Sequence, residues 1–231
     1  MNKIGILGGM SWQSTVLYYR HINRLVNERL GDLHCAECLV SSVDFQRVVD
    51  FQRSTDWKGL ARYLSGHLKS VELAGADFAL MASNTVHLVY DELSEDLKIP
   101  LVHIVDAVGE QLHRRKIKKV GVLGTSYTLK HGLYDHRLRQ SFQVESILPN
   151  ADQAGKLDKL IFGELAHGHV AGEVSSGVFS IVHDLMQRGA EAIVLACTEL
   201  GMLKPFEYPV FDAALIHSQK AVDMALGKKS L

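Results

Sequence analysis

Hydrophobic residues along the chain fall into short continuous runs rather than strict alternation. Continuous runs of about four to eight apolar residues are typical of parallel strands covered on both faces. Such runs predict strands at Lys3–Leu7, Cys38–Val43, Phe78–Ala82, Val102–Val105, Val120–Leu123, Val144–Leu148 and Ala192–Ala196. Longer stretches with helical periodicity lie between them, at Ser14–Leu30, Trp57–Leu73, Ala107–Arg115 and Val178–Gln187. Strands that alternate with amphipathic helices predict an α/β fold with mostly parallel sheets.

The two halves of the chain carry the same pattern of segments. Three segments of the first half recur in the same order in the second half, at similar separations along the chain. The pairs are KIGILGGMS from Lys3 with KVGVLGTSY from Lys119, AGADFALMASNT from Ala74 with RGAEAIVLACTE from Arg188, and PLVHI from Pro100 with PVFDA from Pro209. Because an ordered repeat indicates duplicated structural units, we predict two pseudo-symmetric α/β domains.

Small polar residues gather where the repeated strands end. In open α/β sheets, ligands bind beyond the carboxyl ends of the strands. Here those ends read GGMS, ASNT, GTSY and ACTE. Backbone N–H groups and helix N-termini at such ends can hold an anion. The repeat makes Ser83 equivalent to Cys197, and we expect these two residues to face each other across a cleft between the domains.

The charge balance and the N-terminal sequence narrow the class of protein. The 231 residues include 25 Lys and Arg against 26 Asp and Glu, for a net charge of -1. The chain therefore lacks the basic footprint of a nucleic-acid-binding protein and the polybasic segment that attracts a protein to membranes. The first apolar run is broken by glycine, unlike a signal peptide or a membrane span. Three cysteines without a signal fit a reducing compartment. We expect a cytoplasmic protein that binds neither nucleic acid nor membrane.

Common cofactor and metal motifs are incomplete in this sequence. HCAEC, at His34–Cys38, holds a single CxxC pair. Structural zinc sites normally need four ligands, and no second cysteine pair exists. GILGGM departs from the dinucleotide-binding pattern GxGxxG, and the phosphate-binding pattern GxxxxGK[ST] is absent. The sequence therefore predicts no metal site and neither an NAD nor an ATP site.

Longer motifs surround the polar strand ends. They are GILGGMSWQST at Gly5–Thr15, SNTVH at Ser83–His87, VGVLGT at Val120–Thr125, ACTELG at Ala196–Gly201 and PVFDAALIH at Pro209–His217. In these motifs the chain resembles the aspartate/glutamate racemase family, whose members act without pyridoxal phosphate, and the resemblance covers essentially the whole chain. It implies two Rossmann-like domains, residues 1–98 with 209–231 and residues 99–208, with the active site in the cleft between them. It also implies a homodimer, a small-molecule amino acid as substrate and no cofactor.

The resemblance also implies a reaction that uses two opposed side chains. Family members usually employ two cysteines, one of which removes the α-proton while the other delivers a proton to the opposite face. Cys197 matches the second cysteine through ACTE, whereas Ser83 stands at the position of the first. A hydroxyl is a poorer base than a thiolate, so we predict unequal rates with L and D substrates. Ser83 could instead cap a helix or bind substrate. Cys197 opens a predicted helix, whose N-terminus can lower the pKa of a thiol, so we expect a reactive thiolate.

Further residues around these two positions are expected to bind the substrate. The resemblance indicates Met10, Gln52, Asn84, Thr85, Thr125, Glu164, Thr198 and Glu199. The hydroxyl and amide side chains among them can donate to an α-carboxylate, and Glu199 can accept from an α-ammonium. Glu164 is expected to tune side-chain specificity. Helix capping is the alternative role for residues of these types. At His87, His103 and His217 we expect packed, hydrogen-bonding rings rather than acid–base groups.

These observations favour a cofactor-independent racemase of aspartate, glutamate or a broader set of α-amino acids. Hydrogen-bond donors at the strand ends would stabilise the carbanion-like intermediate. Two alternatives stay open. An enzyme that resembles arylmalonate decarboxylase needs a single cysteine, which Cys197 could supply. A protein that binds an amino acid without catalysis would retain the fold but lose the thiol chemistry.

Overall fold

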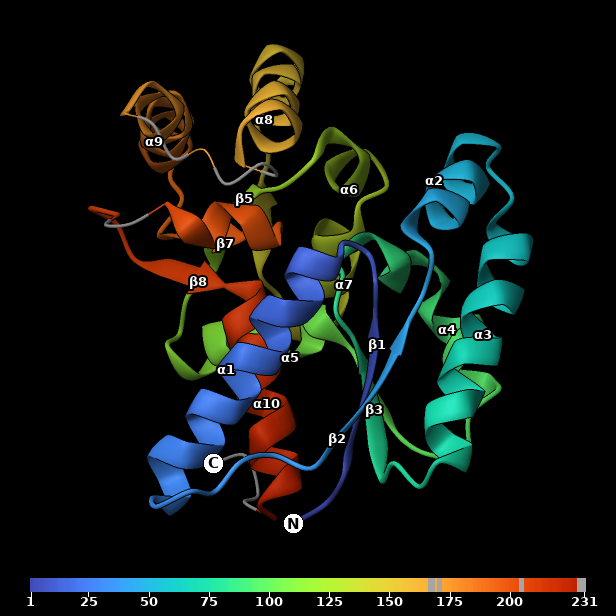
Figure 1. Ribbon diagram of the computed structural model, residues 1–231. Coiled ribbons are helices and arrows are strands. Elements are labelled where there is room, and N and C mark those ends of the chain that lie inside the picture. The colour runs from blue at the N-terminus through green and yellow to red at the C-terminus, as the bar shows by residue number, and fades with distance from the viewer. Residues whose placement is uncertain (166–168, 170–171, 204–205, 228–231) are drawn as a thin grey trace. The chain divides into compact units, whose positions relative to one another are not determined.

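The computed structural model describes residues 1–165, 169, 172–203 and 206–227. They form two compact units, Met1–Ile104 with His217–Leu231 and Val105–Ile216. Each unit contains one four-stranded parallel sheet with helices (Figure 1). The predicted α/β fold with parallel sheets is confirmed.

The sheet of the first unit has the strand order β2-β1-β3-β4. Its strands are β1 (Ile4–Gly8), β2 (Cys38–Ser42), β3 (Phe78–Met81) and β4 (Leu101–Val102). Its helical segments are α1 (Trp12–Leu30), α2 (Phe45–Arg53), α3 (Trp57–Leu73), the 3-10 helix η1 (Thr85–Val89), α4 (Tyr90–Glu95) and most of α10 (Ala213–Ala225). The two central strands, β1 and β3, are buried along their whole length, which explains why their apolar runs do not alternate.

The second unit repeats this arrangement with the strand order β6-β5-β7-β8. Its strands are β5 (Lys119–Leu123), β6 (Glu145–Ile147), β7 (Ala192–Leu195) and β8 (Val210–Asp212). Its helical segments are α5 (Ile104–Arg114), α6 (Ser126–Lys130), α7 (Leu133–Phe142), α8 (Ala151–Gly163), α9 (Gly172–Gln187) and the 3-10 helix η3 (Thr198–Met202). The registers agree as well, because Leu7 pairs with Met81 in one sheet and Leu123 with Leu195 in the other. This agreement confirms the pseudo-symmetry that the repeat predicted.

The helix that follows the last strand of each sheet belongs to the other unit. α5 follows β4 but belongs to the second unit from Val105, and α10 follows β8 but belongs to the first unit from His217. In the second unit, Arg137 of α7 forms a bidentate ion pair with Asp106 of α5, at 2.5 and 2.7 Å. In the first unit, Asp223 of α10 forms an ion pair with Arg29 of α1 at 2.5 Å. The two repeats therefore exchange their last helices.

Three segments differ from the sequence predictions. The predicted strand Val102–Val105 ends at Val102, and α5 begins at Ile104. The apolar run hides this change because the first residues of α5 are buried as completely as a strand. Residues 209–216 were assigned to the first domain, but β8 pairs in parallel with β7 and lies in the second sheet. The chain returns to the first unit only at His217. Residues 99–104 were assigned to the second domain, but β4 pairs with β3 in the first sheet and the first unit extends to Ile104.

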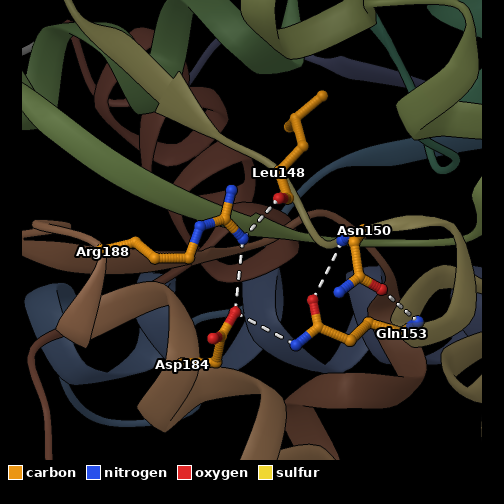
Figure 2. Close-up of polar contacts among 5 residues, drawn as sticks. All are labelled: Leu148, Asn150, Gln153, Asp184 and Arg188. Carbon is orange, nitrogen blue, oxygen red and sulfur yellow. Dashed lines mark hydrogen bonds and ion pairs between the residues drawn. The ribbon is translucent and has the colours of Figure 1, made fainter.

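A polar network joins the start of α8 to the end of α9 (Figure 2). Asn150 and Gln153 form a reciprocal capping box at the start of α8. The Gln153 amide also donates to Asp184 at 3.0 Å, and Arg188 donates to Asp184 at 3.3 Å and to the Leu148 carbonyl at 3.0 Å. These hydrogen bonds lower the pKa of the Asp184 carboxyl. The network therefore holds the N-terminal end of α8 against the C-terminal end of α9.

Candidate active site

Ser83 lies just beyond the carboxyl end of β3. The strand ends at Met81, and the Ala82 N–H still donates to the Leu7 carbonyl at 2.8 Å. Half-buried Ser83 follows, and Asn84 is the N-cap residue of the 3-10 helix η1. The Asn84 side chain makes no capping hydrogen bond to η1, and Ser83 is not the N-cap residue. The Asn84 side chain therefore does not cap η1, which was the alternative role considered for it.

Cys197 lies at the equivalent position beyond β7. Here the strand ends at Leu195, and the Ala196 N–H donates to the Leu123 carbonyl at 2.7 Å. Half-buried Cys197 then precedes the 3-10 helix η3. Both strand ends thus continue by one more sheet hydrogen bond and then turn into a 3-10 helix. Ser83 and Cys197 occupy matching places in their two units, as the sequence repeat predicted.

The Glu199 carboxylate joins the Cys197 thiol to the next residue. Cys197 Sγ donates to Glu199 Oε2 at 3.0 Å, and the Thr198 hydroxyl donates to the same oxygen at 2.7 Å. Glu199 was expected to accept from a substrate ammonium group. In this structure its carboxylate instead accepts the hydrogen of the thiol that the sequence marked as catalytic. A carboxylate within hydrogen-bonding distance of a thiol is a potential acceptor for the thiol proton.

The environment of Cys197 favours the protonated thiol. Burial raises the pKa of Cys197 well above its ordinary value, and the negative charge and hydrogen bond of Glu199 raise this pKa further. Backbone N–H groups of Glu199 and Leu200 act in the opposite sense but have smaller effects. The predicted reactive thiolate is therefore wrong for the protein at rest. The physical reason is that η3 spans only five residues, so its dipole is small compared with burial and a nearby carboxylate.

The remaining predicted residues of the first unit occupy three different segments. Met10 lies between β1 and α1, where its side chain is buried in a hydrophobic cluster with Leu7 and Val43. Gln52 is half-buried near the end of α2. Thr85, also half-buried, is the first residue of η1 and directly follows the Ser83–Asn84 turn. Of these three residues, Thr85 is the one that the chain itself places next to Ser83.

In the second unit, Thr125 begins the turn after β5. Its hydroxyl caps α6 by accepting the Thr128 N–H at 3.3 Å. The neighbouring Ser126 is held by the Asp158 carboxylate of α8, which accepts both the Ser126 N–H at 2.8 Å and its hydroxyl. Asp158 was not predicted from the sequence, because no sequence pattern links a carboxylate on α8 to this turn. The residue that fixes the turn therefore comes from another helix.

Glu164 lies at the end of α8. Its carboxylate is 3.3 Å from His169 Nδ1, and both side chains are substantially exposed. Its expected influence on substrate specificity stays a prediction. The arrangement of Ser83 and Cys197 across a cleft also stays a prediction, as does the homodimer.

The described residues show neither a metal-binding cluster nor a membrane-spanning helix. Among the described residues, no group of three or more histidine, cysteine, aspartate or glutamate side chains is arranged to hold a metal ion. Within the same part of the chain, every helix is too short or too polar to cross a membrane.

Comparisons with known proteins identify the family. The model of the Asp/Glu/Hydantoin racemase family matches residues 7–222. This chain belongs to that family. A similar protein is the broad specificity amino-acid racemase of Bacillus subtilis (strain 168). It is 24% identical to this chain over 233 residues, which cover 98% of this chain and 100% of the relative.

Solved structures of family proteins have the same fold over their whole length. A Yersinia pestis protein described as a candidate Asp/Glu racemase is 36% identical, with a TM-score of 0.92. An aspartate racemase homologue from Pyrococcus horikoshii OT3 is 32% identical, with a TM-score of 0.88. Both matches cover 98% of this chain and 100% of the other. Membership of the Asp/Glu/Hydantoin racemase family confirms the predicted enzyme class, an amino-acid racemase and therefore an isomerase.

Proposed function

We propose that this protein is a cofactor-independent racemase of α-amino acids, in which Cys197 and Ser83 serve opposite faces of the substrate α-carbon. The observation that carries the proposal is the matched position of the two residues, one beyond β3 and the other beyond β7, in a member of a racemase family. The similarity to a broad specificity racemase over the whole chain supports a substrate range that extends beyond aspartate and glutamate.

The proposed reaction begins with the hydrogen bond between Cys197 and Glu199. The thiol proton moves to the Glu199 carboxylate, which accepts that hydrogen bond at rest. The thiolate then removes the α-proton: an S–H bond forms, the C–H bond breaks, and the electron pair stays on the α-carbon and its carboxylate. The Ser83 hydroxyl protonates the opposite face. Solvent carries the proton held by Glu199 back to the Ser83 oxygen, and every group returns to its starting state.

Neighbouring donors have a defined task in this scheme. Deprotonation at the α-carbon places negative charge on the α-carboxylate oxygens of the substrate. Asn84 and Thr85 are the two residues after Ser83 and supply an amide and a hydroxyl donor, whereas the Thr198 hydroxyl already donates to Glu199 at rest. Donors that are fixed before the reaction stabilise such charge without the cost of reorganising solvent.

The chemistry at the two faces is unequal, which predicts unequal rates. A serine hydroxyl is a much weaker base than a thiolate and needs an additional base to act as one. The enantiomer whose α-proton faces Cys197 is therefore deprotonated faster than the other. At equilibrium the two enantiomers are equally abundant, because their free energies are equal.

Proton exchange in D2O tests the proposal. The protein is incubated with L- and D-aspartate, L- and D-glutamate and a wider set of amino acids, with Cys197→Ala as the control. NMR follows loss of the α-proton, and chiral chromatography follows inversion. We expect exchange with inversion that disappears in Cys197→Ala. Absence of exchange with every amino acid would overturn the proposal. Release of carbon dioxide from arylmalonates would then indicate a decarboxylase, and a ligand-induced rise in melting temperature alone would indicate a binding protein.

A further inference from the structure

Three buried histidines meet in the first unit, next to the turn that carries Ser83. His87 belongs to η1, His103 lies between β4 and α5, and His217 belongs to α10. Their exposed fractions are 3%, 4% and 0%. The ring of His87 lies 4.8 Å from that of His103 and 5.7 Å from that of His217, measured between centroids. The proposed proton transfer uses none of these rings. Their close packing beside the Ser83 turn therefore indicates a different role.

The hydrogen bonds of His217 define its protonation state. Its Nε2 lies 3.1 Å from the Val102 carbonyl oxygen, which can only accept, so Nε2 carries a hydrogen. Burial and the proximity of His87 lower the pKa of His217 to about 3, so the ring is neutral near neutral pH. Nδ1 therefore accepts from the Tyr18 hydroxyl at 3.0 Å. His217 is an uncharged ring fixed at both nitrogens.

His87 fixes the turn itself. Its Nδ1 lies 3.1 Å from the Asn84 carbonyl oxygen, and that oxygen also accepts the backbone N–H of His87 at 3.0 Å. Since a carbonyl only accepts, Nδ1 carries the hydrogen. The peptide that joins Asn84 to Thr85 is thus held by two donors from one residue. This peptide is one residue away from Ser83, so the two hydrogen bonds restrain the turn that carries Ser83.

The surrounding rings hold His87 in place. His103 and His217 meet it edge to face, and Tyr90 stacks on it at 6.4 Å with an interplanar angle of 9°. The Tyr90 hydroxyl in turn donates to the Leu101 carbonyl at 2.7 Å. Elements from opposite ends of the chain therefore meet at one side chain, whose ring N–H is directed at the Asn84 carbonyl.

We infer that His87 is a positioning residue for Ser83: its Nδ1–H holds the Asn84 carbonyl and so orients the serine for proton delivery. The inference rests on the proposed function. It extends that function because it names what keeps the weaker of the two acid–base groups in place. Misplacement of a reacting group by about 1 Å can cost about a hundredfold in rate. Cys197 belongs to the other unit and is hydrogen-bonded there to Glu199, so the inference expects its deprotonation step to change little.

The test compares two outcomes of one deprotonation. With the enantiomer whose α-proton faces Cys197, return of deuterium from Cys197 gives exchange with retention, and delivery from Ser83 gives inversion. His87→Leu removes the donor while filling similar space, and His87→Asn places an amide N–H near the position of Nδ1. We expect His87→Leu to lower the ratio of inversion to exchange at least tenfold while exchange changes by less than about threefold. His87→Asn should restore most of the ratio.

His67→Leu is the matched control, because its ring also hydrogen-bonds through Nδ1, but to the Ser41 side chain of β2 at 2.9 Å rather than to the Asn84 carbonyl. It should leave the ratio unchanged. Equal losses of exchange and inversion in His87→Leu would indicate a merely structural role and overturn the inference. An unchanged ratio would overturn it as well. If His87→Leu fails to fold, His87→Gln replaces it, since its longer side chain carries the amide near the position of Nε2. Failure of the wild-type protein to exchange any amino acid is a separate result, which overturns the proposed function itself.

Discussion

Replacing Glu199 by glutamine should make Cys197 more reactive as a thiol and less effective as a catalyst. In the structure one Glu199 oxygen accepts from both Cys197 and Thr198, at 3.0 and 2.7 Å. Glutamine keeps the size of the side chain and a carbonyl acceptor but removes the negative charge that opposes ionisation of the thiol. The pKa of Cys197 should therefore fall in Glu199→Gln, because two of the causes that raise it contain that charge.

The magnitude follows from the distance between the two groups. Two unit charges about 4 Å apart interact by about 1 kcal/mol in water and by about 4 kcal/mol near a protein surface. Since each 1.36 kcal/mol changes an ionisation constant about tenfold, the thiolate population at a fixed pH should rise between about fivefold and about a thousandfold. Cys197 is half-buried, so we expect a value between these limits.

Alkylation with iodoacetamide as a function of pH measures this effect. The background carries Cys35→Ser and Cys38→Ser, which leaves Cys197 as the only thiol of the three in the chain. Glu199→Gln should be alkylated faster at every pH below the pKa of the wild-type thiol, yet racemise more slowly because the acceptor for the thiol proton is gone. Thr198→Val is the control, since it removes the second hydrogen bond and keeps the charge. Equal alkylation rates in Glu199→Gln and its parent would refute the reasoning.

Three further predictions concern stability. His217 stays neutral in the folded protein down to pH about 3, whereas an unfolded histidine binds a proton below pH about 6.5. As the pH is lowered from about 6.5 to about 3, the free energy of unfolding should therefore fall by about 1.4 kcal/mol per pH unit because of His217. Urea unfolding measures this dependence, and His217→Gln should lose it. Asp158→Ala should cost about 1.5–3 kcal/mol, because the carboxylate accepts a backbone N–H and a hydroxyl at the start of α6; Asp152→Ala, at an exposed position of α8, should cost less than about 1 kcal/mol in the same assay. Gly9→Ala should lower the melting temperature strongly, because Gly9 has a φ of +92° and a Cβ would lie 2.3 Å from a backbone oxygen, whereas Gly66→Ala, where a Cβ meets nothing within 4 Å, should leave it unchanged or raise it.

The sequence was informative wherever burial alone determines the structure. β1 and β3 are buried on both faces, so their apolar runs predicted them with errors of one residue at an end. The helix predicted at Trp57–Leu73 agrees with α3, because buried residues recur along one face of it. The boundary after β4 was missed, since Ile104 and Val105 are as apolar and as buried in α5 as they would be in a strand.

The chemistry of the candidate site was harder to predict from the sequence than the fold. The motif ACTE showed that Cys197 and Glu199 are close in sequence. It did not show that the Glu199 carboxylate is hydrogen-bonded to the Cys197 thiol. That orientation depends on side-chain rotamers in a short 3-10 helix. Burial, which is the largest cause, and the Glu199 carboxylate together raise the thiol pKa, whereas a lowered pKa was expected. The contact between Tyr18 and His217 joins residues 199 positions apart, and no local pattern reports such a distance.

The exchange of last helices between the two repeats determines when each unit can be completed during synthesis. The second unit has all its residues once Ile216 has been made, whereas the first unit requires the segment that begins at His217. The Asn2 side chain donates to the carbonyl of Met224, 222 positions later, so even this contact at the start of the chain forms only after Met224 has been synthesised. Contacts between residues so far apart form slowly, and surfaces that wait for them stay exposed to aggregation. The half of the gene that is translated first therefore encodes the unit that is completed last, and a chain that ends just after Ile216 holds every residue of the second unit but only part of the first.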